Sequence, residues 1–221
     1  TMAKEKGLEP LAAILMRQGF VDIESKARFF MNAEVKTIKD ALAGARDIVA
    51  EWVSENSKAR NAIRRLFLQE AVLTSKLVKG KGEDGIKFKD YFDYSEPIKR
   101  IPSHRFLAVM RGAGEGFLKL NVEPDTNKAL GVLEGIFLKD NGDAAIQVSK
   151  AIVDGYKRLL APSIENEVLS ITKERADDDA IGVFAENLRQ LLLAPPLGQK
   201  NVLAIDPGFR TGCKLVCLDK Q

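Results

Sequence analysis

The chain has 221 residues and a mass of 24.3 kDa, and 45% of its residues are hydrophobic and 29% charged. Lys and Arg total 34 against 31 Asp and Glu, which gives a net charge of +3, and the mean hydropathy is -0.13. This composition excludes disordered, collagen-like, disulfide-stapled and membrane-spanning chains. A chain of this length can bury a hydrophobic core without metal or disulfide support, so we expect an ordinary soluble globular protein.

Positive charge is concentrated in one stretch of the sequence. Residues 57–105 hold 12 Lys and Arg against 6 Asp and Glu, a local +6, which leaves -3 for the rest of the chain. The distribution of charge is therefore more informative than the total.

The cysteine and histidine content argues against a zinc site. Cys213, Cys217 and the single histidine, His104, cannot fill four tetrahedral positions. We expect reduced thiols in a cytoplasmic protein. No apolar run approaches the roughly 20 residues of a membrane span, and no signal core follows the first lysines, so no membrane partner is expected. A start inside an amphipathic stretch suggests an excised fragment.

The first 56 residues show helical periodicity. Apolar spacing predicts one helix over residues 4–18, stopped by Gly19, and a short helix that Asp22 opens and that runs through residue 30. A third helix follows, with an apolar face from Val35 to Val53 that spans about five turns.

The pattern changes after Ser57. A basic helix is followed by a β-branched stretch, residues 71–78, that predicts a strand, and then by a Gly- and Lys-rich loop over residues 79–85. Ser103 is expected to cap a helix over residues 104–112, and residues 117–123 alternate like a strand.

Helical periodicity returns beyond Pro124 and continues to about residue 160. Pro162 and Ser163 are expected to precede a new, long amphipathic helix with Glu165 and Glu167 in its first turn. The acidic cluster at residues 177–179 allows this run to be two abutting helices.

Residues 195–221 do not continue the helical pattern. Residues 195–198 are expected to form a linker, and residues 202–205 a strand of the buried type. Residues 206–208 are expected to turn the chain into a second strand over residues 214–218. A two-stranded hairpin is not a domain by itself.

Together these patterns predict a mainly α fold with a small α+β insertion. The expected organisation is a helical region (1–56), a basic α+β insertion (57–125), a helical region continuing the first (126–195), and a linker with a hairpin (196–221).

The basic helix carries the candidate binding residues. Arg60 and Arg64 stand one turn apart on one face, a spacing that suits two phosphates of a nucleic-acid backbone. A solvated helix face explains the same charges without a ligand, and both interpretations stay open. The predicted nucleic-acid-binding residues are Lys58, Arg60, Arg64, Arg65, Arg111 and Lys119.

Asp206 is the candidate for metal chemistry. A carboxylate at the end of a buried strand is typical of RNase-H-like nucleases, in which several acids hold two Mg²⁺ ions. The alternative is that Asp206 accepts backbone N–H groups in an Asx-turn. Since no second strand-end acid accompanies it, we favour the structural reading and predict no catalytic residue and no metal site.

Other motifs have weaker chemical meaning. Residues 79–85 lack the Walker spacing and residues 111–116 fail the dinucleotide fingerprint, so no nucleotide cofactor is assigned. His104 has no nucleophile beside it and is expected to make a structural hydrogen bond. The aromatic residues 91, 92 and 94 either stack bases or pack locally.

Five strings, in order along the chain, resemble the Tex family of transcription accessory proteins, bacterial relatives of a eukaryotic elongation factor. They are residues 6–12 (KGLEPLA), 41–48 (ALAGARDI), 102–105 (PSHR), 185–189 (AENLR) and 206–214 (DPGFRTGCK). The resemblance implies a helical central region followed by the first hairpin of a truncated RNase-H-like domain of the YqgF type. It also implies further modules before Thr1 and after Gln221, which would be the main nucleic-acid binders.

On this resemblance the chain is expected to be a non-enzymatic scaffold of an RNA-binding transcription accessory protein, with the transcription machinery as a further partner. Two alternatives are kept. One is a fragment of a metal-dependent nuclease of the resolvase type that uses Asp206, although the family's other acids would lie beyond Gln221. The second is a protein-interaction platform for the transcription machinery.

Overall fold

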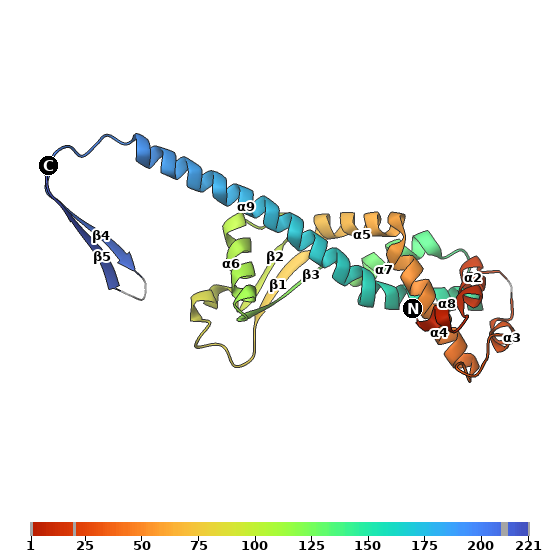
Figure 1. The fold of residues 1–221 in the computed structure, drawn as a ribbon. Helices are drawn as coiled ribbons and strands as arrows, with labels where there is room; N and C mark the ends of the chain where they lie inside the picture. The colour runs from red at the N-terminus through yellow and green to blue at the C-terminus, as the bar shows by residue number, and fades with distance from the viewer. Residues whose placement is uncertain (1, 20, 209–211, 221) are drawn as a thin grey trace. The chain divides into compact units, whose positions relative to one another are not determined.

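The computed structural model describes residues 2–19, 21–208 and 212–220 (Figure 1). The chain consists of two compact units, and the boundary between them lies between Asp179 and Ala180. Most of the described residues are helical, and the strands form two small antiparallel sheets. The mainly α class expected from the sequence is confirmed.

The N-terminal helices are α1 (Met2–Glu5), α2 (Glu9–Arg17) and α3 (Ile23–Arg28). The prediction of one helix over residues 4–18 is wrong. Gly7 has a φ of 75°, a left-handed conformation that interrupts the helix, and a proline in the first turn of α2 starts it again. As expected, Asp22 caps α3, because its Oδ1 accepts from the Ser25 N–H at 3.1 Å.

Long helices form the core of the first unit: α4 (Ile38–Glu55), α5 (Ser57–Glu70), α7 (Thr126–Phe137) and α8 (Asp143–Gly155). Helix α4 packs on α8 so closely that a Cβ at Gly155 would lie 2.9 Å from the Ala50 carbonyl oxygen. The end of α2 is tied to this core through Gln18, whose Nε2 donates to the Phe137 carbonyl at 2.7 Å.

The sequence predicted that α8 stops before Pro162, and this prediction is wrong. Helix α8 continues through a π-helical turn, η2 (Tyr156–Leu160), into α9 (Ala161–Leu193). The Ala161 N–H donates to the carbonyl of Tyr156, five residues back, so the wider turn accommodates the proline that follows, which has no N–H to donate. Glu165 and Glu167 therefore lie inside a helix, and α9 runs uninterrupted through the acidic cluster.

The small sheet has strand order β2-β1-β3, with β1 (Val72–Leu77), β2 (Asp93–Pro97) and β3 (Leu118–Glu123) all antiparallel. Strands β1 and β3 were predicted, whereas β2 and the 3-10 helix η1 (Ile86–Tyr91) were not. In the register, Leu73 lies opposite Val122, and both side chains are buried.

Helix α6 (Ser103–Gly114) packs against strand β3 of this sheet. Ser103 does not cap it, contrary to the prediction. Pro102 is the N-cap residue, and the Ser103 hydroxyl donates instead to Asp179 Oδ2 at 2.6 Å. Because Ser103 is the first helical residue, its side chain is free to reach α9.

The second unit begins with Ala180 of α9 and ends with a hairpin of β4 (Val202–Gly208) and β5 (Gly212–Leu218). The expected buried strand is exposed, with Leu203 at 61% and Ile205 at 58%. Residues 206–208 belong to β4 and do not form the predicted turn, since Pro207 pairs with Cys213 and Gly208 with Gly212. Proline is tolerated there because each strand of a two-stranded sheet has a free edge. Residues 209–211 lie outside the described residues.

Candidate nucleic-acid interface

The basic residues of α5 divide between two faces of the helix. Arg60 and Arg64 share one face, as predicted, and both pair with Glu167 of α9. Arg64 Nε lies 2.7 Å from Glu167 Oε2, and Arg60 Nη2 pairs with Oε1 and also donates to the Ser163 hydroxyl at 3.0 Å. One carboxylate thus binds both guanidinium groups, which were expected to meet two phosphates of a nucleic-acid backbone.

Glu167 is held ionised by this arrangement. The hydrogen bond from Arg64, followed by the one from Arg60, lowers the pKa of Glu167 below its ordinary value. The side chains of Arg60 and Arg64 are 26% and 33% exposed, so both are half-buried against α9. Glu167 neutralises one of the two positive charges, and both guanidinium groups are engaged in ion pairs within the first unit.

Lys58 and Arg65 lie on the free face of α5. They are exposed, and with Ser57, Asn61 and Ala62 they line a shallow hollow of about 450 Å³. Positions 58, 61, 62 and 65 follow the i, i+3, i+4, i+7 spacing of one helical stripe. Across the residues that the structure describes, neither cation has an ion-pair partner. We call Lys58 and Arg65 the α5 cation pair.

Arg111 and Lys119, the other two predicted binding residues, lie on the α+β part of the first unit. Arg111 is on α6 and pairs with Glu115, Nε to Oε1 3.1 Å, while its side chain is 75% exposed. Lys119 lies on β3 directly opposite Lys76 of β1, and both are exposed. Arg111 and Lys119 therefore lie on other elements and do not belong to the stripe on α5.

A groove between η1 and α6 was not predicted as a site. His104, Leu107, Ala108 and Arg111 form one stripe of α6 at i, i+3, i+4 and i+7 spacing. Facing it, η1 contributes Lys87, Phe88 and Tyr91, and the groove has a volume of about 430 Å³. Tyr91 is far enough from His104 and Arg111 in the sequence that no local pattern joins it to them, and the tertiary structure brings the three together.

A family model described as Tex central region-like matches residues 21–184. The chain belongs to the Tex family. The transcriptional accessory protein Tex of Neisseria gonorrhoeae is 38% identical over 99% of this chain, and protein YhgF of Escherichia coli is 37% identical over 99%. The S1 RNA-binding domain-containing protein 1 of Homo sapiens is 28% identical over 98% of this chain and 23% of its own length.

This Tex-family chain spans about 30% of the length of the two bacterial relatives. The family model and these relatives confirm the family resemblance found in the sequence. The YqgF-type identity of the C-terminal hairpin stays a prediction, as do the boundaries expected between the helical regions and the α+β insertion.

Asp206 does not stand at a strand end in this Tex-family structure. It lies within β4 opposite Lys214, whose Nζ is 3.9 Å from Asp206 Oδ2, and both side chains are largely exposed. Its interaction in the described part of the chain is this cross-strand ion pair. Among the described residues, no group of three or more His, Cys, Asp or Glu side chains could hold a metal ion.

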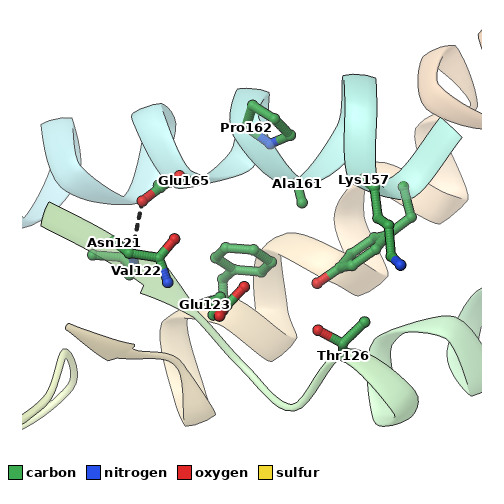
Figure 2. Close-up of a pocket in the computed structure, with 10 residues that line it drawn as sticks. Asn121, Val122, Glu123, Thr126, Lys157, Ala161, Pro162 and Glu165 are labelled. Atoms are coloured by element: carbon green, nitrogen blue, oxygen red, sulfur yellow. Dashed lines mark hydrogen bonds between the residues drawn. The ribbon is translucent and has the colours of Figure 1, made fainter. Parts of the chain in front are cut away.

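A smaller cavity of about 290 Å³ lies where α9 passes β3 and the start of α7 (Figure 2). Glu165 of α9 accepts the Val122 N–H at 2.6 Å, so it satisfies a backbone donor on the edge strand β3. Two carboxylates, Glu123 and Glu165, line the cavity against one cation, Lys157. This charge balance disfavours phosphate there.

Tyr156, which also lines this cavity, is 2% exposed. Its hydroxyl has no hydrogen-bond partner among the described residues. Burial, followed by the negative charges of Glu123 and Asp125, raises the pKa of Tyr156 to about 12. The hydroxyl stays neutral at physiological pH.

No helix among the described residues has both the length and the apolarity that a membrane span requires.

Proposed function

We propose that this chain is a non-enzymatic scaffold region of a cytoplasmic Tex-type transcription accessory protein, and that it contacts RNA through the α5 cation pair. The names of two relatives, a transcriptional accessory protein and an S1 RNA-binding domain-containing protein, support the association with RNA. The C-terminal hairpin would be the first hairpin of an RNase-H-like domain.

The observation that carries the proposal is the different use of the four cations on α5. Arg60 and Arg64 are bound to Glu167, whereas Lys58 and Arg65 are exposed beside a hollow and pair with no described carboxylate. Seven residues separate them, which is roughly 10 Å along a helix axis, so the two can meet two phosphates of one strand.

The scaffold part of the proposal rests on how α5 is held. Arg60 and Arg64 tether it to α9 through Glu167, and Asn56 Oδ1 accepts the Ala59 N–H at 3.0 Å to fix its first turn. Because the helix is fixed at both places, the α5 cation pair is presented without the entropy cost of ordering a loop.

The test is a salt titration of RNA binding. A labelled single-stranded RNA is titrated at several salt concentrations with the native chain and with a Lys58→Glu, Arg65→Glu double variant. Loss of two phosphate contacts should lower the slope of log affinity against log salt by about 1.4.

The matched control is Lys36→Glu with Lys39→Glu, which makes the same charge change at two exposed positions near the start of α4. This control should weaken binding only through the change in net charge. It should leave the slope of log affinity against log salt mostly unchanged. Equal slopes for the two double variants would overturn the assignment of RNA contact to α5.

A further inference from the structure

We propose that the groove between η1 and α6 binds one unpaired nucleotide of single-stranded RNA, with the base against its aromatic wall and a phosphate on its cationic rim. The inference deepens the proposed association with RNA and rests on it, but it concerns a surface that does not include the α5 cation pair.

The wall of the groove is aromatic and held in place. Phe88 is 5% exposed and packs on Phe117 with ring centroids 5.9 Å apart, and Tyr91 meets Tyr94 edge-on at 5.2 Å. Leu107 and Ala108 of α6 close the opposite side. Phe88 therefore forms the floor of the groove, with Lys87 Nζ 5.0 Å from its ring centroid. The half-buried ring of Tyr91 is the one on which an entering base can stack, and such stacking tolerates any base.

Close approach of α6 to this wall depends on Gly112. A Cβ there would lie 2.6 Å from Leu118 Cδ1 and 3.2 Å from Phe88 Cδ1. The groove volume of about 430 Å³ falls in the range of roughly 300–1,000 Å³ that is usual for sites that enclose small molecules. The groove therefore has room for a single nucleotide.

The rim carries net positive charge. Lys87 Nζ lies 2.5 Å from Glu115 Oε2, and Arg111 Nε lies 3.1 Å from Glu115 Oε1, so two cations share one carboxylate. The hydrogen bond from Lys87 is the main cause that lowers the pKa of Glu115, and the carboxylate stays ionised. The balance of these three side chains is +1.

Arg111 is the best-placed phosphate ligand. Only its Nε is engaged by Glu115, and no described residue accepts a hydrogen bond from its two terminal nitrogens. A guanidinium group with both terminal nitrogens available can bind a phosphate through two parallel hydrogen bonds. His104, about two turns away on the same stripe of α6, provides a further polar group at the rim.

The experiment compares two probes on the full chain by fluorescence anisotropy. One is a labelled octamer of uridylate, and the other is an abasic octamer with the same number of phosphates. The native chain should bind the base-bearing probe at least about fivefold more tightly, since a stacked base contributes that much or more.

Tyr91→Leu, which keeps apolar bulk and removes the ring, should reduce this ratio to near one. Arg111→Gln should weaken both probes. Leu107→Glu places a carboxylate in the groove and should also abolish the preference; it carries the test should Tyr91→Leu fail to fold, as judged by circular dichroism.

The outcomes separate the two proposals. The Lys58→Glu, Arg65→Glu variant should lower affinity for both probes and leave their ratio unchanged. If that variant binds like the native chain while the groove variants lose the preference, the α5 assignment fails and the groove stands. The inference is overturned if the ratio survives in both Tyr91→Leu and Leu107→Glu, or if a phosphotyrosine peptide binds the groove when neither octamer does.

Discussion

Helix α9 crosses the boundary between the two units, and its two parts place similar apolar residues in different surroundings. Before Asp179, Ile164, Val168 and Ala176 are buried on one face. After it, Ile181 is 65% exposed and Phe184 66%. Apolar periodicity is present in both parts, so it does not decide burial by itself. Burial requires a packed partner, and only the first unit supplies one.

The same substitution in the two parts of α9 tests this comparison most directly. Val168→Ala should lower the free energy of unfolding by about 2 kcal/mol, because a fully buried side chain loses its contacts. Val183→Ala, at a side chain that is 63% exposed, should change it by less than about 0.5 kcal/mol.

The fluorescence of Trp52, the only tryptophan, measures this in urea, since it packs beside the core of the first unit. Equal effects of the two substitutions would show that the second part of α9 is packed as firmly as the first.

A second variant adds an atom at the crossing of α4 and α8. Gly155→Ala should lower the free energy of unfolding by about 1–2 kcal/mol, because the new Cβ meets backbone atoms of Ala50 at 2.9 and 3.1 Å. Gly135→Ala in α7 is the control, since nothing lies within 4 Å of its Cβ position. It should raise stability by about 0.5–1 kcal/mol through helix propensity. Urea midpoints at a constant slope distinguish the two directions.

The ion pairs of Glu167 give the next largest effect. Glu167→Gln removes the charge that Arg60 and Arg64 share and should cost about 1 kcal/mol at pH 7, as expected for a half-buried pair. The control is Glu70→Gln, whose more exposed pair with Lys128 should matter by less than about 0.5 kcal/mol.

The pH dependence of Glu167→Gln has a defined sign. Folding lowers the pKa of Glu167 from its ordinary 4.5, so its contribution is present above pH 4.5 and is lost as the pH falls through the folded value. Unfolding curves of the native and variant chains should therefore converge in acid. A constant difference between pH 7 and pH 3 would contradict the role given to this carboxylate.

The smallest effect is expected at Tyr156. Tyr156→Phe removes a buried hydroxyl that lacks a described partner, so stability should stay the same or rise by up to about 1 kcal/mol. Thermal unfolding measures the change. A loss of more than about 1 kcal/mol would mean that this hydroxyl makes a hydrogen bond in solution.

Local patterns predicted much of the fold of the first unit. The helices from Asp22 to Glu70 and the strands β1 and β3 follow from apolar spacing and side-chain caps. The continuation of α8 through Pro162 could not be predicted, since a proline in the first turn of a new helix is the commoner case and a π turn leaves no sequence pattern. Strand β2 was missed because it is short and ends on Pro97.

The candidate site was predictable only in part. Spacing alone placed Arg60 and Arg64 on one face, but their partner Glu167 is more than 100 residues away in sequence. The groove residues likewise come from two elements whose contact is tertiary, so the i, i+3, i+4, i+7 stripe on α6 was visible in the sequence while the wall it faces was not.

The hydrogen bond from Val122 to Glu165 has a consequence for assembly. Strand β3 is an edge strand, and the exposed backbone donors of an edge can recruit a strand from another molecule. Here a helix side chain accepts one of these donors at 2.6 Å. The carboxylate occupies one of the positions that a fourth strand would use, so the packing of α9 opposes the addition of a strand at Val122.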